Sequence, residues 1–486
     1  MTAETAETAE TPAPAAPSGD TAEIERMKAL LDQQKAAFAA EPRRTIEERK
    51  ADLKKLEEMV KRRGADFERA ISEDYGRRSA AETKVGEAGF AIATAKHARK
   101  HVARWAAIRK KPVPATLKPG LAYVRREPKG VAGVIAPWNY PMQLAIAPLV
   151  AALAAGCRAM IKPSEFTPRT SDLLKESLGE LFAEDHVAVI TGGPDVAQAF
   201  SSLPFDHLFY TGSTHVGRLV AKAAAENLTP VTLELGGKSP TVVASDFDVS
   251  EAAKTVAWGK FFNAGQTCVA PDYLMVPRGQ QKAAGEAVLA SAEKYWPDPA
   301  NNPDYTGIVS DKHHQRLGEL VEEARSAGAT VLQGEFDASS NARAFPPTVV
   351  IDPPEPTRLM REEIFGPVLP VIGHDGMEDA ARFVNERDRP LALYVYSKSK
   401  TIARRFLERT ISGGAAVNVP LLHLSVEDLP FGGVGASGQG AYHGEYGFLA
   451  FTHERGVFEA PAWHPSRLMA PPYGKVFDFF AKLQTR

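Results

Sequence analysis

The spacing of apolar residues along the chain changes near residue 122. Between residues 22 and 62, apolar side chains recur at helical spacing and the faces between them are charged, which predicts amphipathic surface helices. The apolar positions are Ile24, Met27, Leu30, Leu31, Leu53, Leu56 and Met59. From Ala122 onward, short apolar runs of strand length alternate with stretches typical of helices.

The apolar runs in the first half of the chain predict a parallel sheet. They span residues 131–137, 158–165, 187–193, 207–213 and 231–237, and each contains Val, Ile or Phe and closes on Gly, Pro or Ser. Their alternation with helical stretches is βαβ repetition, which predicts an α/β fold with a doubly wound parallel sheet. Ligands bind such sheets beyond the carboxyl ends of the strands.

A second α/β stretch follows over residues 239–419. Its strand-like runs are TVVAS, YLMVP, TVLQG, TVVID, LALYVYS and AAVNV. Two α/β lobes with a cleft between them suit a cofactor and a second substrate. The tail, residues 421–486, is rich in Gly, Pro and aromatic residues, and we interpret it as an arm without a core of its own.

The charge balance argues against a general attraction to polyanions. The 486 residues include 58 Lys and Arg against 60 Asp and Glu, for a net charge of -2. No global field therefore favours nucleic acid or an anionic membrane. A basic stretch over residues 97–111 lacks the interleaved aromatic residues of a nucleic-acid site, and we interpret it as a solvated or subunit-edge helix.

Neither a secretory signal nor a membrane span is predicted. Residues 1–20 have no basic n-region and no apolar h-region, which favours a disordered leader. Residues 131–157 carry no charge, but Pro137, Pro141 and Pro148 interrupt them, so we expect a strand, a tight loop and a buried helix. The two cysteines are too few for a disulfide framework. We therefore expect a cytoplasmic protein.

The segment FFNAGQTC, residues 261–268, places a thiol after a polar loop that contains glycine. Such a thiol is partly exposed and surrounded by backbone amides, which favours the thiolate. The alternative is a buried structural cysteine, and the apolar context of Cys157 fits that alternative better than the context of Cys268 does. No His or Cys cluster has metal-ligand spacing, so no metal site is expected.

A carboxyl group lies near the end of the apolar strand predicted at residues 231–237. Glu234 is followed there by Gly236 and Gly237. Burial at this position would raise its pKa, which suits a general base at neutral pH. The alternative is an ion pair with Lys238.

Two turns carry weaker signals. Asn139, in APWNYP, follows the first strand of the predicted sheet, where a side-chain amide can donate to a developing oxyanion, although a turn-forming Asn is the better interpretation of this residue alone. In GSTHVG, residues 212–217, a turn precedes a helix whose N-terminus can bind pyrophosphate. Its spacing matches neither the G-x-G-x-x-G fingerprint nor a P-loop.

Taken together, these segments resemble the aldehyde dehydrogenase superfamily in order and spacing, over about residues 22–458. The matching segments are APWNYP, KPSE (162–165), FYTGST, LELGGK, FNAGQTC, EEIFGPV (362–368) and PFGGVGASGQG (430–440). APDY after Cys268, GAYHGEYGFLAFTHER (440–455) and APPY (470–473) look like the class 3 type. AAENLTPVTLELGGKSP and NPDYTGIV (302–309) look most similar to bacterial coniferyl aldehyde dehydrogenases.

The resemblance implies a role for each residue that matches the family pattern. Cys268 would be the nucleophile, Glu234 the general base, and Asn139 an oxyanion donor together with the backbone N–H of Cys268. The implied cofactor is NAD, with NADP possible. Its binding residues would be Trp138, Lys162, Glu165, Gly212, Ser213, Gly217, Leu235, Glu363 and Phe365. Among these, Lys162 and Glu165 would meet the adenosine ribose.

The implied reaction is oxidation of an aldehyde to a carboxylic acid through a thiohemiacetal and a thioester on Cys268. We expect an aromatic substrate such as coniferyl aldehyde, and Tyr140 and Phe262 would line its tunnel unless both simply fill core. The alternatives are a medium- or long-chain fatty aldehyde, acyl transfer to coenzyme A instead of water, and a non-catalytic protein that has kept the fold.

The resemblance also implies a division of the chain into domains. After the leader, the NAD(P)-binding domain would comprise residues 21–107 and 131–232, and the α/β catalytic domain residues 233–420. Residues 108–130 and 421–486 would form an oligomerisation arm and C-terminal tail. That arm would pair two copies into a soluble homodimer, with no nucleic-acid or membrane partner.

Overall fold

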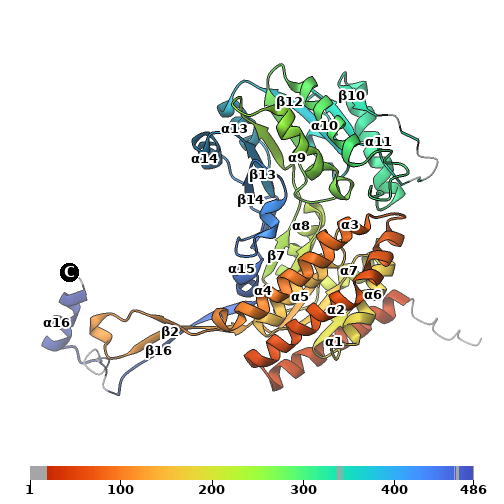
Figure 1. The fold of residues 1–486 in the computed structure, drawn as a ribbon. Helices are drawn as coiled ribbons and strands as arrows, with labels where there is room; N and C mark the ends of the chain where they lie inside the picture. The colour runs from red at the N-terminus through yellow and green to blue at the C-terminus, as the bar shows by residue number, and fades with distance from the viewer. Residues whose placement is uncertain are drawn as a thin grey trace, which may run out of the picture.

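The computed structural model describes residues 19–334, 336–337, 341, 343–462, 464, 466 and 470–484, which form two α/β bodies and a projecting arm (Figure 1). The leader expected over residues 1–20 lies outside the described residues, except for Gly19 and Asp20. These two residues begin the first helix, α1 (Gly19–Ala40).

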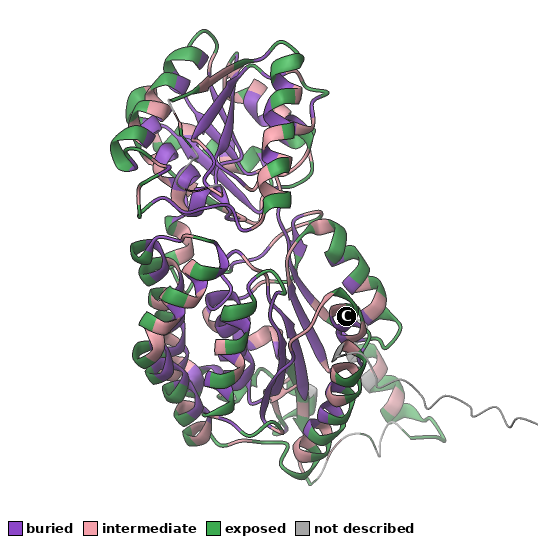
Figure 2. Cartoon of the chain, turned by 90° about the vertical axis from the view of Figure 1, so that its right-hand side faces the viewer, coloured by how far each residue is buried: buried purple, intermediate pink, exposed green. Residues whose placement is uncertain are grey.

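Helices from the N-terminal part of the chain cover one body. The helix α2 (Ile46–Asp74) begins with a capping box in which Thr45 and Glu48 each bond the other's backbone N–H. It is followed by α3 (Ala80–Thr83), the π-helical turn η1 (Lys84–Gly89) and α4 (Phe90–Trp105). The amphipathic helices predicted from the sequence are therefore present, and Leu53 and Leu56 of α2 are fully buried. Figure 2 shows that helices of this body carry both buried and exposed residues.

A six-stranded sheet forms the centre of this first body, in the order β15-β7-β6-β3-β4-β5. Its strands are β3 (Val131–Ile135), β4 (Arg158–Lys162), β5 (Val187–Val189), β6 (His207–Thr211), β7 (Val231–Glu234) and β15 (Gly438–Gln439). The first five are parallel, as predicted, and β15 pairs antiparallel with β7. Their crossover helices are α5 (Gln143–Ala155), α6 (Pro168–Gly179), α7 (Pro194–Ser201) and α8 (Thr214–Ala225).

The order of this sheet reverses beside β3, because β4 lies on one side of it and β6 on the other. At such a switch point the loops after the two neighbouring strands turn in opposite directions and leave a crevice for a ligand. The loops after β3 and β6 begin at Ala136 and Gly212. The sequence segments APWNYP and GSTHVG therefore flank one crevice.

The uncharged segment at residues 131–157 forms a strand, a loop and a helix, as predicted. Every residue of α5 is buried. Within the described part of the chain, no helix combines the length and the apolar character that a membrane crossing requires.

The second body is built on a seven-stranded sheet in the order β10-β11-β12-β9-β8-β13-β14. Its strands are β8 (Pro240–Val243), β9 (Tyr273–Pro277), β10 (Thr330–Gln333), β11 (Thr348–Ile351), β12 (Val368–His374), β13 (Ala392–Tyr396) and β14 (Gly414–Val417). Its helices are α9 (Val249–Phe261), α10 (Gln281–Tyr295), α11 (Asp311–Ser326), α12 (Arg358–Arg361), α13 (Met377–Asn385) and α14 (Lys400–Arg409). Only β10 is antiparallel to its neighbour.

Six of these strands coincide with the predicted runs, and β12 was not predicted. It lies between β11 and β9 in the middle of the sheet. Pro370 stands inside β12, opposite Val350. A proline within an apolar run argues against a central strand because proline has no backbone N–H to donate. In β12 the strand is formed without a backbone hydrogen bond from Pro370 N.

The arm is a three-stranded antiparallel sheet of β1 (Arg109–Lys111), β2 (Leu121–Pro128) and β16 (Thr452–Glu459). With α16 (Lys475–Gln484), it extends away from both bodies (Figure 1). The basic stretch at 97–111 is thus only partly a helix, since α4 ends at Trp105 and residues 109–111 are the edge strand β1.

The part of the tail before β16 forms η5 (Leu422–Ser425), β15 and α15 (Gly444–Ala450) instead of joining the arm. The turn η5 contacts β14 of the second body, whereas β15 and α15 pack on the first body. Phe448 and Phe451 are fully buried there. The structure therefore places residues 421–451 differently from the arm that the tail's composition predicts, because buried aromatic side chains tie this stretch to the core.

Candidate active site

A cleft of about 1290 Å³ lies between the two bodies, at the switch point of the six-stranded sheet. Of the residues predicted from the sequence, those that line it are Trp138, Asn139, Gly212, Ser213, Glu234, Leu235, Cys268, Glu363 and Phe365. The predicted residues that do not line it are Tyr140, Lys162, Glu165, Gly217 and Phe262. The structure thus brings the three proposed catalytic residues into one cavity.

The loop that carries Cys268 is fixed by unusual backbone conformations. After α9, the residues Asn263 and Ala264 have φ angles of 53° and 49°, and Gly265 follows with φ of 73°. A Cβ atom on Gly265 would lie 2.3 Å from the carbonyl oxygen of Gly366, so only glycine fits. The side chain of Gln266 then donates to Asn263 O and Gly307 O, both at 3.0 Å. Cys268 is therefore presented by a rigid loop.

Burial holds the Cys268 thiol in its protonated form. Desolvation in the cleft, and to a smaller extent the adjacent carboxyl groups of Glu363 and Glu234, raise its pKa to about 12, because a carboxylate repels a thiolate. The backbone N–H groups of Cys268 and Val269 act in the opposite direction. The thiol is partly exposed, as predicted, and the loop amides act in the predicted direction, although desolvation outweighs them in the pKa of the thiol.

Glu234, at the end of β7, is buried and has no hydrogen-bond partner at either carboxyl oxygen among the described residues. Burial raises its pKa well above the ordinary value, as predicted. The alternative pairing with Lys238 does not occur, because Lys238 pairs with Asp272 and donates to the carbonyl oxygens of Leu359 and Glu362. Glu234 is thus an unpartnered acid in the same cavity as the thiol.

Glu363 packs against the glycines that follow Glu234. A Cβ atom on Gly236 would lie 1.9 Å from Glu363 Oε2. Burial raises the pKa of Glu363 to about 8, partly offset by the backbone N–H of Gly237. Arg316, which the sequence analysis did not identify, donates to the carbonyl oxygens of Glu363 and Ile364 at 2.7 and 2.9 Å. It thereby fixes the backbone of this segment without neutralising the Glu363 carboxyl group.

The first body offers a place for a dinucleotide. Ser213 caps α8 by accepting from the N–H of Val216, and the other N-terminal amides of this helix face the cleft end of β6. A Cβ atom on Gly212 would lie 2.2 Å from Tyr210 Oη, and one on Gly217 would lie 2.5 Å from Leu235 Cδ2. The absence of a side chain at both glycines therefore leaves room for the side chains of Tyr210 and Leu235 to pack against the backbone beside the N-terminus of α8.

Lys162 is the last residue of β4 and Glu165 follows shortly after it, and both lie outside the cleft lining. Lys162 Nζ is 3.3 Å from Glu165 Oε2 and donates to Pro163 O at 2.8 Å. The lysine is buried while the carboxylate is partly exposed. This pair fits the hydroxyl groups of a ribose, because it offers one cationic donor and one anionic acceptor side by side.

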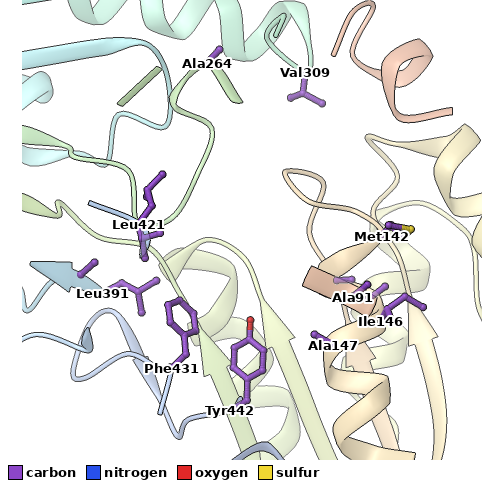
Figure 3. Packing of buried hydrophobic residues seen from close by; sticks show 14 of the residues in the cluster. Ala91, Met142, Ile146, Ala147, Ala264, Val309, Leu391, Leu421, Phe431 and Tyr442 are labelled. Carbon is purple, nitrogen blue, oxygen red and sulfur yellow. The ribbon is translucent and has the colours of Figure 1, made fainter. Parts of the chain in front are cut away.

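Aromatic side chains close the other end of the cleft. Trp138 makes edge contacts with Phe365 and His313, at ring-centroid distances of 5.2 and 5.0 Å. Phe431 and Tyr442 lie side by side next to Leu391 and Leu421 (Figure 3), with ring centroids 5.6 Å apart. The sequence analysis missed His313, Phe431 and Tyr442 as lining residues, although the latter two lie within segments that it quoted.

Tyr140 and Phe262, the proposed tunnel residues, meet each other at Gly86 instead of in the main cleft. A Cβ atom on Gly86 would lie 3.1 Å from the Tyr140 ring and 3.5 Å from the Phe262 ring. Tyr140 is buried, and its hydroxyl group bonds Thr267 Oγ1 at 2.7 Å. Phe262 is only partly buried. The two rings thus lie next to the Cys268 loop on a side that the cleft does not reach.

Cys157 has the environment of a structural cysteine. It is fully buried, and its thiol donates to the carbonyl oxygen of Phe451 at 3.3 Å. Burial raises its pKa to about 11. It belongs to a hydrophobic core cluster that extends through both bodies, and it does not line the cleft.

Comparisons with known proteins agree with this arrangement. A model of the aldehyde dehydrogenase family matches residues 5–457. A probable coniferyl aldehyde dehydrogenase of Pseudomonas aeruginosa is 45% identical over 93% of this chain and 95% of its own. Human aldehyde dehydrogenase family 3 member B1 is 39% identical over 86% of this chain and 88% of its own.

Solved structures share the fold. Staphylococcus aureus AldH, in a substrate-bound state, has a TM-score of 0.89 and 37% identity, with 94% of this chain and 99% of that chain covered. A Mycobacterium tuberculosis aldehyde dehydrogenase complexed with NAD+ has a TM-score of 0.83 and 28% identity, with 90% and 91% covered. The chain therefore belongs to the aldehyde dehydrogenase family.

Proposed function

We propose that this protein oxidises an aromatic aldehyde, such as coniferyl aldehyde, to the carboxylic acid with NAD as the hydride acceptor. The observation that carries the proposal is that Cys268, Glu234 and Asn139 line one cleft, with both oxygens of the Glu234 carboxyl group unpartnered among the described residues. The substrate is suggested by the relative from Pseudomonas aeruginosa, and the cofactor by the NAD+ complex of the Mycobacterium enzyme.

In this mechanism, the Cys268 thiol gives its proton to solvent, and the thiolate attacks the carbonyl carbon of the aldehyde, forming a thiohemiacetal. The side-chain amide of Asn139 and the backbone N–H of Cys268 donate to the oxyanion. As the C–O bond returns to a carbonyl, hydride leaves the thiohemiacetal carbon and a thioester remains on Cys268; bound NAD+ would supply the cationic ring that accepts this hydride. Glu234 then takes a proton from water, the resulting hydroxide attacks the thioester carbonyl, and the sulfur leaves as the acid is released.

The cofactor would lie along the first body, over residues 21–107 and 131–232. The N-terminus of α8, at Ser213, would hold the pyrophosphate, and the Lys162–Glu165 pair the adenosine ribose. Glu363 and Phe365 would flank the nicotinamide ribose. This arrangement favours NAD, and NADP is the alternative to test alongside it. Residues 233–420 would supply the nucleophile.

We propose that the enzyme is a cytoplasmic homodimer joined through the arm. Leu121 and Phe458 lie near its tip with 57% and 47% of their surface exposed. In the strand register, Leu121 pairs with Glu459 and Phe458 with Ala122, so the two side chains are on opposite faces of the arm. A second copy that clasps the arm would cover both. The two free cysteines fit a reducing compartment.

Replacing Cys268 with Ala should abolish NADH formation, while Cys157→Ala should leave most of it. The first change removes the nucleophile, and the second removes a buried sulfur in the core. Steady-state absorbance assays with coniferyl aldehyde and either NAD+ or NADP+ measure both effects. An active Cys268→Ala enzyme alongside an inactive Cys157→Ala enzyme would reverse the assignment.

Glu234→Gln should slow thioester hydrolysis about 100-fold while a pre-steady-state burst of NADH survives, because a glutamine cannot accept the proton from water. The wild-type rate of hydrolysis should rise with pH above the ordinary titration range of a glutamate, since only the deprotonated form is a base and burial raises its pKa. This pH dependence should disappear in the variant.

Loss of the burst in Glu234→Gln would instead place Glu234 before hydride transfer. Product analysis in the presence of coenzyme A provides the control for acyl transfer. Formation of an acyl-coenzyme A by the wild-type enzyme would contradict hydrolysis as its natural reaction.

We propose that the aldehyde reaches Cys268 from the side of Tyr140 and Phe262, which the main cleft does not reach, and this route predicts a size-dependent effect at Gly86. Gly86→Val would place methyl groups between the rings of Tyr140 and Phe262, and it should raise KM for coniferyl aldehyde about 10-fold with little change for acetaldehyde. Phe262→Ala removes a wall that contributes about 1 to 3 kcal/mol to binding of an aromatic ring, so it should also raise KM for coniferyl aldehyde selectively. Equal changes for both aldehydes would mean that these rings only fill core.

The double variant Leu121→Glu/Phe458→Glu should halve the mass measured by light scattering, because burying a carboxylate at an apolar interface is costly. Leu228→Glu is the matched control, since Leu228 is 91% exposed on the first body and should leave the mass unchanged. A double variant with the mass of the wild-type protein would show that the arm does not form the dimer.

A further inference from the structure

Arg78 is a charged side chain with no solvent exposure, and the mechanism above does not use it. It lies between α2 and α3, and its Nη1 atom is 3.2 Å from Glu87 Oε1, on a carboxyl side chain that is equally buried. The guanidinium also lies over the rings of Tyr75 and Tyr140, at 5.0 and 4.8 Å from their centroids. The sequence analysis gave no reason to single it out.

The same guanidinium binds the backbone of the proposed oxyanion donor. Arg78 Nη1 donates to the carbonyl oxygen of Asn139 at 2.9 Å. That oxygen also accepts from Tyr75 Oη at 3.0 Å and from Asn263 Nδ2 at 3.1 Å. Three donors therefore converge on a single main-chain oxygen, which is more than one carbonyl in a turn requires.

The partner of Arg78 holds the next part of the same loop. Glu87 Oε2 accepts from the backbone N–H groups of Met142 and Gln143, at 3.1 and 2.7 Å. The Arg78–Glu87 pair thus fixes the chain on both sides of Tyr140. The side chain of Asn139 is left to line the cleft beside Cys268.

The network also reaches the loop of the nucleophile. Asn263, which donates to the Asn139 carbonyl oxygen, donates to Gln266 O at 3.0 Å, and its backbone N–H donates to Glu82 Oε2 at 3.0 Å. The Tyr140 hydroxyl group bonds Thr267, the residue before Cys268. One buried set of polar contacts therefore ties the Asn139 loop to the Cys268 loop, although the two loops belong to different bodies.

A buried ion pair is a poor source of stability, because desolvation offsets its attraction and well-packed apolar residues often do as well. What such a pair does provide is a fixed geometry. We propose that Arg78 is a positioning residue that sets the distance between the Asn139 amide and the Cys268 sulfur. This inference rests on the proposed role of Asn139 as oxyanion donor. A misplacement of about 1 Å can cost a reaction about 100-fold in rate.

The test uses Arg78→Lys in the full chain. Lysine keeps the positive charge beside Glu87, but its flexible four-carbon stem does not hold the ammonium group at the fixed position from which Arg78 Nη1 reaches both Glu87 Oε1 and the Asn139 carbonyl oxygen. The rate of the NADH burst should fall about 10- to 100-fold. The thermal unfolding midpoint should change little.

Two further variants separate positioning from stability. Arg78→Met/Glu87→Gln removes both buried charges together, so no unpaired charge remains, and it should slow the burst like Arg78→Lys. Arg158→Met is the matched control, because Arg158 is also buried and donates to backbone oxygens of Asp185 and Ala37, away from the cleft. It should lower the unfolding midpoint without changing the burst rate.

A double-mutant cycle with Asn139→Ala decides the proposal. If Arg78 acts through Asn139, adding Arg78→Lys to Asn139→Ala should not slow the burst further. If the double variant slows the burst by the product of the two single effects, or if Arg78→Lys alone leaves the burst normal, the positioning role is wrong. The proposed function is untouched by either result. A normal burst in Asn139→Ala alone overturns both the oxyanion assignment and this inference.

Discussion

Desolvation of acidic groups between the two bodies is the constraint on which the chemistry of the cleft depends. Glu234 is buried there, Cys268 and Glu363 are partly buried, and desolvation is the leading cause of the raised pKa of each. Lys238 and Arg316 lower the pKa of Glu363 only in part, because Lys238 pairs with Asp272 and Arg316 bonds the backbone oxygens of Glu363 and Ile364. Each acid is therefore held neutral, and any positive charge that enters the cleft favours the reactive anions.

The cleft exists because two parallel sheets end at the same place. In the first sheet, the order reverses beside β3, and the loops after β3 and β6 diverge around a crevice. Residues 235–239 then connect β7 directly to β8 of the second sheet, with Gly236 packed against Glu363. The short connection keeps Glu234 on one body within the same cavity as Cys268 on the other.

Helices from the start of the chain hold this arrangement together. Side chains on and between α2, α3 and η1 contact the backbone of the Asn139 loop and of the Cys268 loop through Tyr75, Glu82 and Glu87. These contacts are buried and polar, so each has a specific direction and length, unlike the apolar contacts around them. The two loops consequently share one rigid support, although more than a hundred residues of sequence separate them.

The strands and the chemistry of single residues could be predicted from the residues alone. Apolar runs rich in Val and Ile favour strands, so β3 to β7 and six strands of the second sheet could be predicted, as could Cys268 after a polar loop and Glu234 at the end of a strand. Tertiary structure decided the rest. Pro370 interrupts the apolar run of β12, so this strand was not predicted. Desolvation outweighs the loop amides in the pKa of Cys268. Buried aromatic residues hold residues 421–451 against the two bodies instead of in the arm. Arg78 gives no local signal, because its role arises only when three distant segments converge on one carbonyl oxygen.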